Sequence, residues 1–591
     1  MYRAPLREMR FVLEELLHAG SLSTCPAYAE YSDELGRSVL EEAARFAQDV
    51  LEPLNQPGDR SGARWTPEGV VTAPGFRAAY EKFVAGGWPA LGSEPQFGGQ
   101  PVPRVLVNAV GEFWGSANLA FKLGPMLTHG AVHALELTGS EAQKRRYLPK
   151  MVSGEWSGTM VLTEAQAGSD LGMVRSRAVP EGDHFRLFGQ KIFITWGDHD
   201  LTTNTIHMVL GRIEGAPAGV KGISLFIVPK VLLNADGSLG ERNDVRCLSI
   251  ERKLGIHASP TCVLAFGERT GAVAYLIGEA GHGLEYMFIM MNSARLSVGS
   301  EGYAVGERAL QRATEWARTR VQGRPPGAQP GSAAPIVNHP DVKRMLLTMK
   351  SQTEASRALT LYTAMQLDLA AASPDAAVRA AAQARGELLT PIVKGWCTET
   401  GNEVAAIGVQ VHGGMGFIEE TGAAQYVRDV RITTIYEGTT GIQSNDLIGR
   451  KLGRDRGAAM LGFIAEMQRE LEALGGGPAV EAVRRAALDA VTQLAGATGA
   501  LLKALGTRPE LAQSVSVPYL KLCGYVAGGW LLAKSAAIAA VQSGSSDREF
   551  YAAKLRTTGF YAAQVLPGAA ALARIVESGG ASVADTDAAL I

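Results

Sequence analysis

The chain has 591 residues, a formal net charge of −2 and 20% charged residues. This length exceeds what one hydrophobic core supports, so we expect several structural units. The near-zero charge offers no global attraction for nucleic acid or an anionic membrane, which disfavours those partners. The five cysteines are scattered singly without CxxC or CxxH spacing, which argues against a disulfide framework or a zinc site and favours a reducing compartment.

Neither end of the chain predicts a membrane segment. The N-terminal stretch MYRAPLREMRFVLEELL mixes acidic with apolar residues, so no export signal is expected. The most apolar late run, residues 525–541, contains two glycines and a lysine, and we predict a buried helix there rather than a membrane span. His129 and His133 lie four residues apart but lack a third ligand nearby, so no metal site is expected. We expect a cytoplasmic protein.

The hydrophobic period changes twice along the chain. It is helical up to about Gly154, alternating between about 156 and 278, and helical again from Leu284 onward. The fold class is therefore mostly α with a middle β domain. We predict a leading segment (1–35), an N-terminal helical domain (36–155), a middle β domain (156–280), a helical bundle (281–455) and an additional C-terminal helical domain (456–591).

Two stretches of the predicted β domain are candidates for binding a planar ligand. The first, MVLTEAQAGSD (160–170), ends a strand near Thr163 and turns through small residues, which exposes a hydroxyl and backbone N–H groups. A capped turn explains it equally well. The second, KIFITWG (191–197), ends in Thr195 and Trp196, a hydroxyl and a flat aromatic. A plain strand with an aromatic at its edge is the alternative.

Three further stretches suit anionic or phosphate-bearing groups. MMNSARL (290–296) places Asn292 and Arg295 one helical turn apart, and ARTRVQG (317–323) ends a helix with two arginines. Ordinary surface charges explain both as well. QVHGGMG (410–416) has three glycines that permit close backbone approach, but it lacks the G-x-G-x-x-G spacing of a dinucleotide site. The chain also lacks GxxxxGK[ST] and HExxH.

The stretch RITTIYEGTTG (431–441) holds a single carboxylate, Glu437, among apolar and β-branched residues. Such surroundings disfavour the charged form, which raises the pKa of a carboxyl group toward that of a useful base. An ordinary loop carboxylate is the alternative.

Taken in this order, TEAQAGSD, KIFITWG, MNSAR, ARTRVQGR, QVHGGMGF and IYEGTTGIQ resemble the acyl-CoA dehydrogenase family of flavoproteins. The leading segment and the extra C-terminal unit resemble its long branch, which includes 3-methylmercaptopropionyl-CoA and broad-range acyl-CoA dehydrogenases. The resemblance implies a helical domain, a β-barrel-like domain and a helical bundle. It also implies FAD bound noncovalently between subunits of a homodimer or homotetramer, an acyl-CoA substrate, and electron-transfer flavoprotein as the electron acceptor.

The resemblance also implies roles for individual residues. FAD would be held by Met160, Val161, Leu162, Thr163, Ser169, Phe193, Ile194, Thr195, Thr439 and Gly441, and from the neighbouring subunit by Arg318, Gln410, Val411, His412, Gly413 and Gly414. The acyl-CoA would meet Ser169, Asn292, Arg295 and Gly438. Glu437 would be the catalytic base; some relatives carry the base at the position of Ala294, where alanine cannot serve.

The implied reaction is α,β-dehydrogenation to a trans-2-enoyl-CoA, a step of fatty acid metabolism. Glu437 would remove the α-proton while the β-hydrogen leaves as hydride to flavin N5. Two donors to the thioester oxygen, one of them the Glu437 backbone N–H, would stabilise the developing enolate. The substrate would be 3-methylmercaptopropionyl-CoA or a short- or medium-chain fatty acyl-CoA. One departure from the family pattern is Ala165, where proline is usual, and it affects only local loop rigidity.

Two other functions remain open on the sequence. An acyl-CoA oxidase would pass the electrons to oxygen, and oxygen access cannot be read from residues. A nucleic-acid-associated flavoprotein of the same fold would need a basic stripe in 457–591, where the charges are nearly balanced. An inactive assembly subunit is disfavoured because Glu437 and the glycine motifs are present.

Overall fold

The computed structural model describes residues 2–327, 329, 331 and 333–591. The chain forms two compact units. We call Met1–Ala44, Pro103–Ser116 and Arg295–Ile591 the helical unit, and Arg45–Val102 and Ala117–Ala294 the barrel unit. The predicted division into five segments stays a prediction.

The barrel unit is built on a sheet whose strands close into a ring. β4 pairs with both β5 and β6, so β5, β12, β7, β6 and β4 follow one another around a closed path. β11 and β10 extend the sheet from β5, and β3 lies parallel beside β6. The strands are β3 (Trp156–Val161), β4 (Arg177–Glu181), β5 (His184–Thr195), β6 (Asn204–Ile213), β7 (Ile223–Pro229), β8 (Val231–Leu233), β9 (Leu239–Arg242), β10 (Val245–Ile250), β11 (Thr261–Phe266) and β12 (Ala272–Ile277). The ring strands, the flanking strands β3, β10 and β11, and the separate β8–β9 pair together account for the alternating pattern of the sequence between Trp156 and Ile277.

Helices and a short hairpin complete the barrel unit. They are α3 (Glu52–Ser61), β1 (Arg64–Thr66), β2 (Gly69–Val71), α4 (Phe76–Ala85), the second part of α5 (Arg104–Thr138), α6 (Glu141–Val152) and the start of α7 (Gly283–Thr319). The β1–β2 hairpin interrupts a region predicted to be helical, because Gly69 permits the backbone (φ 144°) that reverses the chain. Asn118 leaves helical geometry inside α5, and its side chain accepts a bond from the backbone N–H of Phe121.

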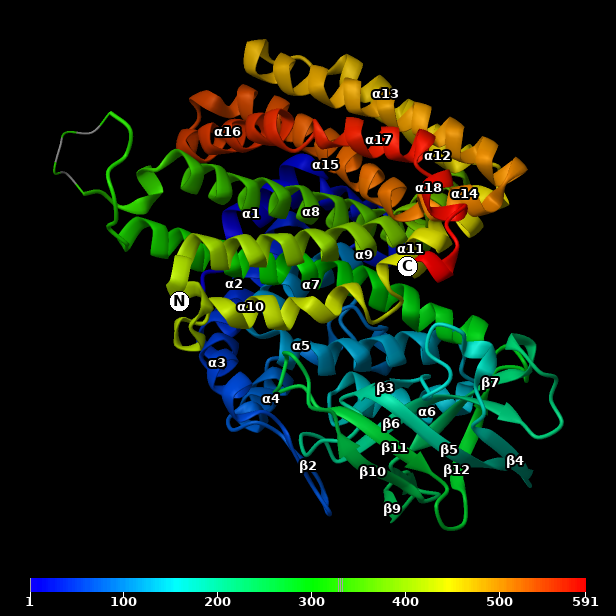
Figure 1. The fold of residues 1–591 in the computed structure, drawn as a ribbon. Helices are drawn as coiled ribbons and strands as arrows, with labels where there is room; N and C mark the ends of the chain where they lie inside the picture. Colours follow the sequence, from blue (N-terminus) through cyan, green and yellow to red (C-terminus); the bar gives the residue numbers. More distant parts are fainter. Residues whose placement is uncertain (1, 328, 330, 332) are drawn as a thin grey trace. The chain divides into compact units, whose positions relative to one another are not determined.

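The helical unit is centred on α15 (Ser516–Val541). This helix is apolar on nearly all sides and contacts α8, α9, α13, α16 and α17; the last three lie alongside it in Figure 1. The other helices are α1 (Leu6–Arg10), α2 (Asp33–Phe46), α8 (Pro340–Ala372), α9 (Ala376–His412), α10 (Ala423–Val430), α11 (Thr440–Asn445), α12 (Ala458–Ala473), α13 (Gly477–Thr507), α14 (Pro509–Ser514), α16 (Arg548–Gln564), α17 (Gly568–Ser578) and α18 (Ala581–Ala584). The additional C-terminal helices therefore share one core with α8 and α9.

Glycines allow α15 to approach α9 closely. A Cβ atom at Gly524 would lie 2.2 Å from Cγ of Trp396, which is itself 1% exposed. Since such a contact is far inside van der Waals distance, glycine is required where the two helices meet.

Buried charges join the N-terminal segment to the rest of the helical unit. Lys554 of α16 is 2% exposed, and its Nζ lies 2.5 Å from Glu8 and 2.6 Å from Glu354. Arg357 of α8 pairs with Glu112 at 2.6 Å and with Glu307 at 2.8 Å. Pairing of this kind offsets the free-energy cost of burying these charges.

Two segments of the described chain are long and apolar enough to cross a membrane, Ser516–Val541 and Arg548–Ser578. The first is α15, whose apolar window is 78% buried inside the protein. This agrees with the buried helix predicted there, although the helix starts nine residues before the predicted run and is longer than it. The second is 39% buried and consists of α16 and α17, which are separate helices.

Candidate active site

Glu437 lies in a tight turn of the helical unit. The turn connects the 3₁₀ helix η12 (Arg431–Thr434) to α11, where the Thr439 hydroxyl caps the helix by accepting from the Ile442 backbone N–H. Glu437 and Gly438 both adopt positive φ, 58° and 89°. Glycine adopts this backbone at little cost, but for glutamate it costs about 1 kcal/mol or more. A non-glycine residue held in this conformation is a sign of a functional constraint.

Two buried side chains hold the carbonyl groups of this turn. The Gln443 amide donates to the carbonyl oxygens of Glu437 (3.0 Å) and Gly438 (3.1 Å). The Lys394 ammonium of α9 donates to the Gly438 carbonyl at 2.6 Å. Gln443 and Lys394 are both 0% exposed. The strained backbone is therefore fixed by groups that water does not reach.

The Glu437 carboxyl group has the properties of a base near neutral pH. Burial raises its pKa from the usual 4.5 to about 7, with Glu301 contributing in the same direction and the charges of Arg295 and Lys394 opposing it. Its Oε2 atom is buried and has no hydrogen-bond partner in the described part of the chain. An unsatisfied buried carboxylate oxygen is costly and is available to accept a proton from a bound molecule.

The charges around Glu437 come from several elements of the helical unit. Arg295 of α7 is buried and pairs with Asp446 at 3.2 Å; burial lowers the pKa of its guanidinium. The Tyr436 hydroxyl donates to Glu301, also on α7. Asn292 lies on the same helix and is exposed, so the predicted Asn292–Arg295 pair has one solvent-facing and one buried member.

In the barrel unit, the 160–170 motif is anchored by Glu164. Its carboxylate accepts from the Ser176 hydroxyl (2.6 Å) and the Arg175 backbone N–H (2.8 Å), and it pairs with buried Lys191 at 2.9 Å. Burial alone would raise the pKa of Glu164, but Lys191 and these donors lower it to about 2. The loop that follows Thr163 is thus fixed, with Ser169 exposed beyond it.

Met160 and Thr163 are partly exposed, whereas Val161 and Leu162 are buried, so only their backbone can reach a ligand. In the second motif, Phe193 is 59% exposed, Thr195 is partly exposed and Ile194 is 2% exposed. The structure thus offers a ligand the Phe193 ring and the Thr195 hydroxyl, while the Ile194 side chain belongs to the core.

The interpretation of Trp196 as a ligand-facing aromatic is wrong. Its side chain is 3% exposed, donates from Nε1 to the Ala120 carbonyl at 3.2 Å and packs near Phe76. A positive φ of 52° after the end of β5 turns Trp196 inward, whereas the φ of 61° at Phe193 leaves that ring outside. Alternation alone could not foresee these two breaks in the strand.

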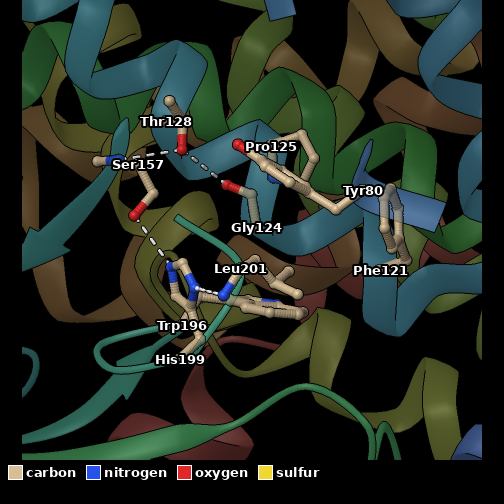
Figure 2. A pocket seen from close by; sticks show the side chains of 10 residues that line it. Tyr80, Phe121, Gly124, Pro125, Thr128, Ser157, Trp196, His199 and Leu201 are labelled. Atoms are coloured by element: carbon tan, nitrogen blue, oxygen red, sulfur yellow. Dashed lines mark hydrogen bonds between the residues drawn. The ribbon is translucent and has the colours of Figure 1, made fainter. Parts of the chain in front are cut away.

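Trp196 instead lines a small cavity inside the barrel unit, together with Tyr80, Phe121, Pro125, Thr128, Ser157, His199 and Leu201 (Figure 2). The cavity measures about 10 Å³, room for a single water molecule rather than a flavin ring. His199 accepts from the Leu201 backbone N–H at Nδ1 (3.1 Å), so its Nε2–H donates to Ser157 Oγ (2.9 Å). Ser157 is therefore not an activated nucleophile.

The 410–416 motif spans the end of α9, which includes Gln410 to His412, and the start of the 3₁₀ helix η10 (Gly413–Phe417). Gly413 and Gly414 are exposed, and a Cβ atom at either would meet no atom within 4 Å. His412 and Val411 are buried, and the His412 ring stacks on Trp316. The open glycines are available for close approach by a ligand, as is Gln410, which is exposed. Arg318 is exposed near the C-terminus of α7.

The described parts of the chain contain no group of three or more His, Cys, Asp or Glu side chains that could hold a metal ion. Lys394 and Gln443, which contact the Glu437 turn, were not among the residues predicted from the sequence. Gln443 stands six residues after Glu437, inside the segment that carried the resemblance, but Lys394 comes from α9 and gives no local signal. Glu164 and Lys191 each lie in a motif recognised from the sequence, but the ion pair between them was not predicted.

Four family models match successive parts of the chain between residues 33 and 587. They are the acyl-CoA dehydrogenase N-terminal domain (33–155), middle domain (159–268) and C-terminal domain (281–453), and a model described as acetyl-CoA dehydrogenase C-terminal like (463–587). The first three cover more than half of the chain.

The chain is 47% identical over 569 residues to 3-methylmercaptopropionyl-CoA dehydrogenase of Ruegeria pomeroyi, covering 96% of each. It is 34% identical over 602 residues to the broad-specificity linear acyl-CoA dehydrogenase FadE5 of Mycobacterium tuberculosis, covering 98% of this chain and 97% of that protein. A solved acyl-CoA dehydrogenase from Bacillus anthracis, complexed with FAD, matches with a TM-score of 0.74 at 20% identity, covering 96% and 91% of the two chains. The predicted fold class, enzyme class and flavin cofactor are confirmed: the chain belongs to the acyl-CoA dehydrogenase family.

Proposed function

We propose that this protein catalyses the FAD-dependent α,β-dehydrogenation of an acyl-CoA thioester to a trans-2-enoyl-CoA, with Glu437 as the base. The observation that carries the proposal is the unpartnered, buried Oε2 of a carboxyl group whose pKa is raised to about 7. A base needs a pKa near the working pH and a free oxygen directed at no other protein group.

The side chains present fit a flavin. Phe193 supplies an exposed aromatic face, Thr163 and Thr195 supply hydroxyl groups, and the open backbone at Gly413 and Gly414 leaves room for a phosphate-bearing group. We assign the FAD contacts to Met160–Thr163, Ser169, Phe193–Thr195, Thr439 and Gly441, and from a neighbouring subunit to Arg318 and Gln410–Gly414.

In the proposed reaction, Glu437 takes the α-proton on its free carboxylate oxygen. FAD, when bound, supplies the hydride acceptor for the β-hydrogen. The backbone N–H of Glu437 is a donor for the thioester oxygen, where negative charge develops as the proton leaves. The acyl-CoA would be contacted by Ser169, Asn292, Arg295 and Gly438.

For the substrate we favour 3-methylmercaptopropionyl-CoA or a short- to medium-chain fatty acyl-CoA, because the relative at 47% identity is named for the former. We propose electron-transfer flavoprotein as the electron acceptor. We also propose that the protein is cytoplasmic and forms a homodimer or homotetramer. We also propose the domain division 1–35, 36–155, 156–280, 281–455 and 456–591, with the last domain covering the acyl-CoA entrance or a subunit contact.

The test compares Glu437→Gln with a matched control, Glu279→Gln, whose carboxyl group is 82% exposed. Both proteins should bind flavin and acyl-CoA, but only Glu437→Gln should lose turnover, by about three orders of magnitude or more. Turnover would be followed with thioesters of increasing chain length and a methylthio-substituted one. Retention of turnover in Glu437→Gln would place the base elsewhere.

An acyl-CoA oxidase is the second candidate from the sequence. Rapid-mixing reoxidation of the substrate-reduced enzyme separates the two functions. A dehydrogenase should react slowly with dissolved oxygen and rapidly with electron-transfer flavoprotein, whereas the opposite order would identify an oxidase.

A further inference from the structure

Lys394 is a buried cation that forms no ion pair with the residues that the structure describes. It is 0% exposed, and in the described part of the chain its ammonium group makes one hydrogen bond, to the Gly438 carbonyl, and no ion pair. Burying an unpaired ammonium group costs several kcal/mol. Accordingly, burial lowers the pKa of Lys394 to about 8, although the charge of Glu437 opposes this. The hydrogen bond from Lys394 to the Gly438 carbonyl offsets part of this free-energy cost and fixes the Glu437 turn.

The same helix holds the turn at a second point. Five residues after Lys394, Glu399 of α9 accepts a bond from the Thr440 hydroxyl at 2.7 Å, at the start of α11. Gln443 of α11 is a third contact, because its amide donates to the carbonyl groups of both Glu437 and Gly438, the two residues with positive φ. The backbone at Glu437 and Gly438 is thus clamped from α9 and α11 together.

We propose that Lys394 and Gln443 are positioning residues for Glu437: they hold the left-handed backbone that directs the carboxylate, and Lys394 also supplies the unpaired positive charge beside it. The inference rests on the proposed role of Glu437 as the base. Both side chains donate hydrogen bonds to the turn, but only Lys394 also carries a positive charge.

The charged and titratable groups that face Glu437 come from four elements. Arg295 and Glu301 of α7, Lys394 of α9 and the Tyr436 hydroxyl act on Glu437 directly, whereas Glu399 of α9 acts on Lys394 and Asp446 of η13 (Asp446–Leu452) pairs with Arg295. Arg295 is paired with Asp446, so Lys394 is the cation whose charge is not balanced by a direct ion pair. Removing it should raise the pKa of Glu437 further and reduce the fraction of ionised base at neutral pH.

Three variants of the full-length, flavin-bound enzyme separate position from charge. Lys394→Met removes both the hydrogen bond and the charge, Lys394→Gln keeps a donor but no charge, and Gln443→Leu keeps the charge but removes the amide. We expect kcat to fall about tenfold or more in Lys394→Met, with KM changing less than kcat. The acid limb of the kcat–pH profile should move to higher pH in both Lys394 variants and stay in place in Gln443→Leu, whose kcat should also fall.

A second readout is independent of turnover. Infrared titration follows the protonated-carboxyl band that is present in the wild type and absent from Glu437→Gln. Its midpoint should rise in Lys394→Met and Lys394→Gln and stay unchanged in Gln443→Leu. If Lys394→Met fails to fold, the other two variants decide the question.

An unchanged pH profile and an unchanged carboxyl midpoint in both Lys394 variants would overturn the inference. Failure of the proposed function is distinguishable, because in that case Glu437→Gln itself keeps its turnover. An inactive Glu437→Gln beside wild-type behaviour of the Lys394 and Gln443 variants refutes only the positioning role.

Discussion

Replacing Glu437 with glutamine should make the protein more stable, and increasingly so at higher pH. In the unfolded chain this carboxyl group ionises near its ordinary pKa of 4.5, but in the folded protein only near 7. The ionised form is therefore disfavoured by folding, so the wild type loses stability as pH rises from about 4.5 through about 7. Glutamine has no charge to bury and avoids this loss.

The two pKa values set the size of the effect. Their difference corresponds to about 3 kcal/mol once the pH exceeds 7. The Glu437 side chain is only partly shielded from solvent, so this figure is an upper limit. Between pH 5 and pH 8 the stability advantage of Glu437→Gln over the wild type should grow by about 1–2 kcal/mol.

Urea unfolding of the flavin-bound, substrate-free proteins at pH 5, 6, 7 and 8 measures this difference. Glu68→Gln serves as the control here and should show no such trend, since Glu68 is an exposed residue of the β1–β2 hairpin. A stability difference for Glu437→Gln that is constant with pH would mean that the carboxyl group is not desolvated in the folded protein. The argument for a neutral-range base would then fail.

Two further predictions concern the core of the helical unit. Lys554→Met should destabilise the protein by about 3–5 kcal/mol in urea unfolding, because it removes the cation of Glu8 and one of the two cations, Lys350 and Lys554, that pair with buried Glu354; a loss under about 1 kcal/mol contradicts this. Gly524→Ala should cost about 1–3 kcal/mol by thermal unfolding, because its Cβ would overlap Trp396. Gly499→Ala, with open space around it on α13, should instead be neutral or stabilising, and equal effects for both glycines would refute the close-packing explanation.

Much of the fold could be predicted because the relevant signals are local. The change from helical to alternating periodicity marks the barrel strands from Trp156 to Ile277, since strand and helix place apolar residues at different spacings. The apolar run at 525–541 predicted a buried helix, again from a local signal. The β1–β2 hairpin was missed because three-residue strands carry too little pattern.

The sequence by itself determined the family, the two kinds of structural unit and the identity of the single carboxylate in 431–441, because each depends on residues close together in the chain. Only the tertiary structure decided that Trp196 faces the core, that α9 sends Lys394 to the Glu437 turn, and that the Glu437 oxygen is left without a partner. The physical reason is that burial and charge proximity arise from residues distant in sequence. A pKa depends on those surroundings and not on the residue type alone.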